Sequence, residues 1–270
     1  MAMLLTVNGA RTFCYTGGKA FDPAQPTVVF IHGVLNDHSV WILQTRYFAN
    51  HGWNVLAVDL PGHCKSEGEP PRSVEEAADF VVALLDAAGV QKAALVGHSF
   101  GALVALEAAA RAPERVTHLA LVGIAFPMKV SPALLENAEH HPFKAIEMVN
   151  VYSHSMLAPP PSALGPGTWL YGGSRALMRH VLASNRKVNV FHRGFVACDS
   201  YAGGEAAIAK VQCPVLFLLG TNDAMTPPKA ARSLQDRAKN GRTVLVEGGH
   251  QMMTETPDAV LFALRDFLRE

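Results

Sequence analysis

The stretch ALVGHSFGAL, residues 94–103, decides the fold of this chain. Its apolar start predicts a strand buried in a sheet, and the alanines, leucines and valine that follow to residue 110 predict a helix. Gly97 and Gly101 flank Ser99 and allow a turn so tight that a side chain at either position would collide with its neighbours. We therefore expect Ser99 at the tip of a sharp strand-to-helix turn, with its hydroxyl exposed close to the helix N-terminus.

A Gly-x-Ser-x-Gly pattern in this setting is typical of a nucleophilic serine held on a strained turn. The five-residue pattern is weak by itself, because glycine and serine are common residues. The alternative is a glycine-rich turn that carries an incidental serine. The buried strand before Ser99 and the helix after it favour the nucleophile.

Composition limits the classes of protein to which the chain can belong. Its 270 residues suffice for one large domain, and 49% of them are apolar while only 17% are charged, against about a quarter in typical soluble domains. Lys plus Arg equals Asp plus Glu at 23 each, so no nucleic-acid surface is predicted. No apolar run is long enough for a membrane span and no signal peptide is recognisable, so we expect a cytoplasmic protein without a membrane partner.

The cysteines and histidines show no short ligand motif. Four cysteines are widely spaced without a Cys-x-x-Cys pair, and twelve histidines include no His-Glu-x-x-His spacing. We therefore predict free thiols in a reducing compartment, and neither a metal nor a cofactor. The oligomeric state is left open by the sequence.

Apolar runs of strand length alternate with stretches of helical periodicity along most of the chain. A hairpin is expected around Asn8-Gly9 within residues 3–16. Strands are expected at 26–31, 53–59, 94–98, 116–124, 214–219 and 243–246, and helices at 41–50, 73–88, 100–110, 228–239 and from 257 onward. This alternation predicts an α/β fold with a mostly parallel twisted sheet flanked by helices.

The alternation stops at residues 127–205, which contain several short helical stretches and no clear strand. We interpret this segment as a helical lid inserted into a core made of residues 1–126 and 206–270. Large apolar residues of the segment are candidates for the lining of a substrate pocket, although packing within the lid is the commoner role. They are Phe143, Met148, Tyr152, Met156, Leu157, Trp169, Met178, Phe191 and Phe195.

Four motifs, spread over nearly the whole chain, occur in the order found in the α/β-hydrolase superfamily. They are His32-Gly33 after the third strand, Asp59-x-Pro61-Gly62 after the fourth, the Gly97–Gly101 turn, and Asp223 followed by Gly249-His250. The chain resembles that superfamily, and the resemblance implies a catalytic triad of Ser99, Asp223 and His250. It also implies an oxyanion hole formed by the backbone N–H groups of Phe100 and Val34. Cys64 departs from the pattern, because related sequences often have glycine at this position.

The positions of these residues in the sequence also support their assignment to the triad. Serine needs an adjacent base to become a nucleophile at neutral pH, and His250 follows the last strand, at the same sheet edge as Ser99. Asp223 directly follows a strand, and its alternative role is an Asx turn or a helix cap. Weaker candidates for the acid are Asp199, Asp236 and Asp258.

The resemblance implies hydrolysis of a carboxylic ester or lactone through an acyl-enzyme on Ser99, with a small substrate that has an apolar acyl part. Carbon–carbon bond hydrolases of this fold usually carry Ser-Met-Gly-Gly and a tryptophan after the histidine. This chain has Ser99-Phe100-Gly101-Ala102 and His250-Gln251 instead. Carbon–carbon cleavage or other triad chemistry on a small ketone remains the alternative, and a slow-turnover ligand receptor is a third hypothesis.

Overall fold

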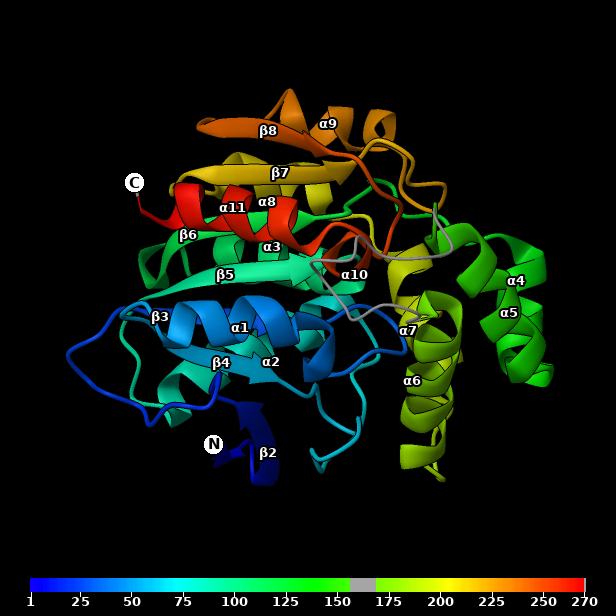
Figure 1. Ribbon diagram of the computed structural model, residues 1–270, viewed down its shortest axis with the longest axis horizontal. Helices are drawn as coiled ribbons and strands as arrows, with labels where there is room; N and C mark the ends of the chain where they lie inside the picture. The colour runs from blue at the N-terminus through cyan, green and yellow to red at the C-terminus, as the bar shows by residue number, and fades with distance from the viewer. Residues whose placement is uncertain (156–168, 270) are drawn as a thin grey trace.

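An eight-stranded sheet runs through the protein (Figure 1). The computed structural model describes residues 1–155 and 169–269. The strand order is β1-β2-β4-β3-β5-β6-β7-β8. β1 and β2 form an antiparallel hairpin at one edge, β2 also pairs antiparallel with β4, and β3 to β8 are parallel to one another. The strands are β1 (Ala2–Val7), β2 (Ala10–Tyr15), β3 (Thr27–Ile31), β4 (Asn54–Val58), β5 (Ala93–His98), β6 (Val116–Val122), β7 (Val215–Gly220) and β8 (Gly241–Val246). This confirms the mostly parallel α/β sheet.

Helices cover both faces of the sheet, because the central strands β3, β4 and β5 are mostly apolar and are buried at every position. In β3, Val28 and Phe30 belong to one hydrophobic cluster, whereas Val29 and Ile31 belong to the other, as expected when successive side chains point to opposite faces. Two helices cover the first face and three cover the second (Figure 1). They are α1 (Ile42–Ala49) and α11 (Pro257–Leu268), and then α2 (Val74–Ala87), α3 (Phe100–Arg111) and α8 (Gly204–Lys210).

Short helical segments occupy several connections. They are η1 (His38–Trp41), η2 (Pro113–Arg115), η3 (Pro228–Ala231), α9 (Arg232–Gln235) and α10 (Met252–Glu255). The helix expected over 228–239 is present but shorter, because it ends at Gln235. A 3₁₀ turn starts at Pro228, and the chain must leave the helix in time for Asn240 to accept a hydrogen bond from the N–H of Val215 at 2.8 Å. That bond begins the pairing of β7 with β8.

Four of the five helices that the structure describes between β6 and β7 lie together beyond the ends of the parallel strands (Figure 1). We call them the inserted helices: α4 (Pro132–His140), α5 (Pro142–Ser153), α6 (Leu170–Ser184) and α7 (Val190–Ser200). They bury a hydrophobic cluster of their own, to which Leu35 of the sheet's loops contributes. A membrane-crossing helix would need more length and a more apolar composition than any helix in the described part of the chain has.

The turn around Ser99 has the close contacts that the sequence predicted. A Cβ atom on Gly97 would lie 2.0 Å from the backbone oxygen of Gly101, and one on Gly101 would lie 2.4 Å from the oxygen of Ile31. Ser99 itself has φ 54° and ψ −117°, a strained conformation for a residue with a side chain. Strand β5, helix α3 and the end of β3 are thus in backbone contact at this one point.

We predict that Gly97→Ala lowers the free energy of unfolding by about 2–3 kcal/mol, because the added methyl group overlaps backbone atoms that cannot rotate away. Urea unfolding followed by circular dichroism measures the change. Gly173→Ala is the control, since a Cβ there has nothing within 4 Å and alanine favours the interior of α6. Equal stability of Gly97→Ala and wild type would contradict the account of the turn.

Candidate active site

Ser99 lies at the carboxyl end of β5, directly before α3. Its backbone N–H donates to the oxygen of Val122 at 2.9 Å, and its own oxygen accepts from the N–H of Ala102 at 2.9 Å. The backbone of Ser99 is therefore held on both sides of the turn by hydrogen bonds. Ser99 and His250 line the same cavity.

Asp223 and His250 are buried and in direct contact. Asp223 follows β7 and His250 follows β8, and Nδ1 of the ring is 2.8 Å from Oδ2 of the carboxylate. Burial alone would raise the pKa of Asp223, but the charge of His250 and hydrogen bonds from His250 and Thr226 outweigh it and hold the pKa far below its usual value. An ionised carboxylate only accepts hydrogen bonds, so Nδ1 of His250 is the donor in this contact.

Asp223 also caps the turn that follows it. Its Oδ1 accepts the backbone N–H groups of Met225 at 2.9 Å and Thr226 at 2.7 Å. The two roles that the sequence left open for this residue, turn-capping and contact with a histidine, are therefore both present, one on each carboxylate oxygen.

Thr226 completes this group, and sequence reasoning missed it. Its buried hydroxyl is 2.7 Å from Oδ2 of Asp223, 3.0 Å from Nδ1 of His250 and 3.0 Å from the backbone oxygen of Gly123. The available signal was a threonine three residues after an aspartate, a spacing typical of side chains that share a turn. Thr226 thus connects the acid and the histidine to the loop after β6.

His98 contacts His250 through a hydrogen bond and through its ring. Its Nε2 is 2.9 Å from the backbone oxygen of His250, and the two ring centroids are 4.6 Å apart. Burial, and then the charge of His250, lowers the pKa of His98 to about 3, so the ring is neutral and donates this hydrogen bond.

The turn that carries His250 is also tied to the end of α5. The N–H of Gln251 donates to the oxygen of Ser153 at 3.0 Å. Glu255, which is fully buried, accepts from the N–H groups of Gly249 and Ser155. A carboxylate with these donors bridges the histidine turn and the inserted helices.

The two predicted oxyanion donors lie on either side of Ser99. Phe100 is the first residue of α3, where backbone N–H groups have no partner within the helix. Val34 lines a small hollow together with Ser99 and His250, and a Cβ on Gly33 would lie 3.2 Å from the Cβ of Ser99. The loop after β3 therefore passes directly beside the serine.

His32 and Asp59 hold the neighbouring loops. His32 donates from Nδ1 to the oxygen of Gly33 at 2.8 Å and accepts from the N–H of Leu60 at 3.1 Å. Asp59 is 2.7 Å from Nδ1 of His38. These contacts brace the loops after β3 and β4. Asp199, one of the weaker candidates for the acid, instead accepts from the N–H of Val130.

A cavity of about 460 Å³ opens above Ser99. Its walls come from the inserted helices and from the loops after β6 and β7. Apolar side chains dominate the lining, among them Met128, Leu134, Met148, Val149, Tyr152, Phe195 and Met225.

The large apolar residues proposed as lining from the sequence fall into several groups. Met148, Tyr152 and Phe195 line the cavity. Met178 lines the smaller hollow beside Ser99. Phe191 is buried among the inserted helices, whereas Phe143 and Trp169 are exposed to solvent. Met156 and Leu157 lie outside the described residues.

Comparison with known proteins gives the family. A family model described as "alpha/beta hydrolase fold" matches residues 26–158, and one described as "TAP-like protein" matches residues 196–270. A pimeloyl-[acyl-carrier protein] methyl ester esterase from Neisseria meningitidis serogroup C is 30% identical over 274 residues, which cover 93% of this chain and 96% of the relative. The chain belongs to the α/β-hydrolase fold family.

More distant members of the family match over most of the chain. An (E)-2-((N-methylformamido)methylene)succinate hydrolase from Acinetobacter baylyi is 24% identical, with 89% of each chain covered. The crystal structure of an enol-lactonase from Burkholderia xenovorans LB400 superposes with a TM-score of 0.85 at 22% identity, over 99% of this α/β hydrolase and 100% of that chain. This structural likeness concerns the fold.

We predict that Thr226→Val slows covalent labelling of Ser99 by diisopropyl fluorophosphate about tenfold, because the hydroxyl that holds Asp223 and His250 in register is lost while the shape is kept. Mass spectrometry of the labelled protein against time gives the rate. Thr226→Ser keeps the hydroxyl and should label within about twofold of wild type. Valine and serine variants that label equally fast would show that the hydroxyl has no positioning role.

Proposed function

We propose that this α/β hydrolase cleaves a carboxylic ester or lactone through an acyl-enzyme on Ser99, with His250 as the base and Asp223 as the acid. The observation that carries the proposal is the 2.8 Å contact between Asp223 and Nδ1 of His250, on a histidine that lines one cavity with Ser99. The pair fixes the tautomer in which Nε2 can take a proton.

The reaction follows from these positions. Nε2 of His250 removes the hydroxyl proton as Oγ of Ser99 attacks the substrate carbonyl, and the negative oxygen is stabilised by the N–H groups of Phe100 and Val34. The imidazolium, held by Asp223, returns the proton to the leaving alcohol. Water then attacks the acyl carbon while His250 takes its proton, the bond from that carbon to Oγ breaks, and His250 returns the proton to Oγ as the acid leaves.

The substrate class follows from the cavity. A space of about 460 Å³ with methionine, leucine, valine and phenylalanine in its walls suits a small molecule with an apolar acyl part. Two similar proteins, a methyl ester esterase and an enol-lactonase, support ester or lactone chemistry over carbon–carbon cleavage or ligand reception without turnover.

We further propose that residues 127–205 act as a lid on a core of residues 1–126 and 206–270. The support is the composition of the cavity wall, in which Leu134 of α4, Met148 of α5 and Phe195 of α7 face loops of the sheet. A substrate in the cavity would be held between the two parts.

Ester hydrolysis is tested with p-nitrophenyl butyrate. Wild type should show a burst of nitrophenol followed by steady turnover, and Ser99→Ala should lower kcat/KM by roughly a thousandfold or more, because the nucleophile is lost. Ser200→Ala, an exposed serine on α7, is the matched control and should keep the wild-type rate. Equal rates for Ser99→Ala and wild type would sink the proposal, and ligand binding without turnover would favour the receptor hypothesis.

The acyl preference is tested with a series of p-nitrophenyl esters from acetate to hexanoate. We expect kcat/KM to rise by about two- to fourfold per methylene, since each buried CH₂ contributes about 0.8 kcal/mol. Met148→Glu, which places a charge in the apolar wall, should reduce hexanoate hydrolysis much more than acetate hydrolysis, whereas Met148→Leu should preserve the series. A flat series in wild type would argue against the cavity as the acyl site.

A further inference from the structure

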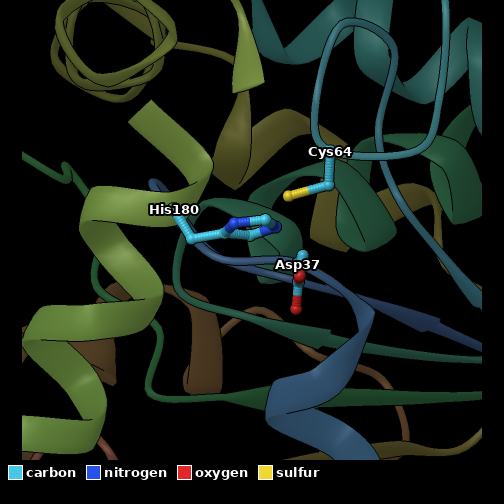
Figure 2. A group of neighbouring side chains, drawn as sticks. All are labelled: Asp37, Cys64 and His180. Carbon is cyan, nitrogen blue, oxygen red and sulfur yellow. The ribbon is translucent and has the colours of Figure 1, made fainter. Parts of the chain in front are cut away.

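Three side chains with different ligand atoms, none of them part of the Ser99, Asp223 and His250 group, converge at one place (Figure 2). Asp37 precedes η1, Cys64 lies in the loop after β4, and His180 lies on α6. The carboxylate oxygen, the sulfur and the ring nitrogen all lie within 4.8 Å of one another. Figure 2 shows the three groups facing one another from three separate segments of the chain.

We propose that Asp37, Cys64 and His180 form a zinc site that fastens α6 to the loops of the sheet. A thiolate, an imidazole and a carboxylate are the donors that Zn²⁺ takes in proteins, whereas Mg²⁺ and Ca²⁺ take oxygen ligands. The thiolate and the carboxylate neutralise the two charges of the ion. A water molecule as the fourth ligand would complete a tetrahedron.

The spacing of the donors suits this ion. With bonds of about 2.0 to 2.3 Å, the ligand atoms of tetrahedral zinc lie about 3.3 to 3.7 Å apart. Donors within 4.8 Å of one another reach that spacing by small side-chain rotations. Asp37 is buried, Cys64 is half-buried and His180 is exposed, so the ion can enter from the solvent side.

Neighbouring groups hold the donors in place, as surrounding residues do in known metal sites. Oδ1 of Asp37 accepts from the N–H of Ser39 at 2.8 Å and from its hydroxyl at 2.5 Å, so Oδ2 can serve as the ligand. The N–H of Cys64 donates to Oγ of Ser184 at 3.0 Å, and Nδ2 of Asn185 donates to the oxygen of Gly62 at 3.0 Å. The end of α6 thus already contacts the loop that carries the thiol.

The thiol is protonated in the metal-free protein, because burial, and then the charges of Asp37 and Asp59, raises the pKa of Cys64 to about 12. Zinc binding breaks the S–H bond, forms the Zn–S bond and transfers the proton to solvent. Cys64 has φ 44°, in the left-handed region where a glycine would be unstrained. The chain thus has a cysteine at a position where its backbone conformation is less favourable than that of glycine would be.

Sequence spacing gave no sign of this site. The ligands are separated by 27 residues (64 − 37) and 116 residues (180 − 64), so no short motif exists. The prediction of no metal rested on local motifs alone and did not address ligands from distant segments.

The test uses the full chain, freed of metal by a chelator and titrated with ZnCl₂ in a calorimeter. Wild type should bind one zinc ion, and both Cys64→Gly and His180→Ala should raise the Kd by more than about tenfold. Glycine fits the φ of Cys64 and His180 is exposed, so both variants are expected to fold. Cys213→Ala and His51→Ala are the matched controls and should bind zinc as wild type does.

A second measurement identifies the sulfur ligand. Co²⁺ bound in place of zinc should give a thiolate-to-metal charge-transfer band in wild type and in the controls, and none in Cys64→Gly. The proposal is overturned if wild type binds no zinc, or if Cys64→Gly and His180→Ala bind it as tightly as wild type. Neither outcome bears on ester hydrolysis by Ser99, which is measured separately.

Discussion

The contact between Gly97 and the backbone of Gly101 is the constraint on which the rest of the structure depends. The oxygen of Gly101 occupies the space where a side chain at position 97 would be. The backbones of β5 and α3 are therefore in direct contact, with no side chain between them. This contact holds Ser99 in a conformation that an isolated peptide would avoid. The conformational strain at Ser99 is offset by the packing of the buried strands and helices on both sides of the turn, which cannot separate without exposing apolar surface.

Parallel strands then bring the remaining groups to the same place. Loops after β3, β5, β7 and β8 all leave the carboxyl edge of the sheet, and they carry Val34, Ser99, Asp223 and His250. Residues that are far apart along the chain become neighbours because each directly follows a strand. For this reason the candidate group could be assembled from the sequence: a polar residue at the end of an apolar run has a predictable position.

Side chains whose place in the site depends on hydrogen bonds to other segments could not be predicted from their position after a strand. Thr226 and His98 belong to the group through hydrogen bonds whose partners depend on the packing of the loops. The stretch 228–239 has helical composition, yet the pairing of β7 with β8 ends the helix early. The cavity, likewise, depends on how the inserted helices sit over the sheet, which local periodicity does not determine.

The buried carboxylate of Glu255 has a mechanical consequence. It accepts from Gly249, next to His250, and from Ser155, just beyond α5, while Gln251 bonds to Ser153. These bonds join the end of α5 to the segment that presents the imidazole, so the two behave as one rigid piece. A displacement of α5 would either break the hydrogen bonds that Glu255 and Gln251 make or move the segment of His250 with the helix. Met148 and Tyr152 of α5 line the cavity together with His250, so the width of the cavity on this side and the position of His250 are coupled through these bonds.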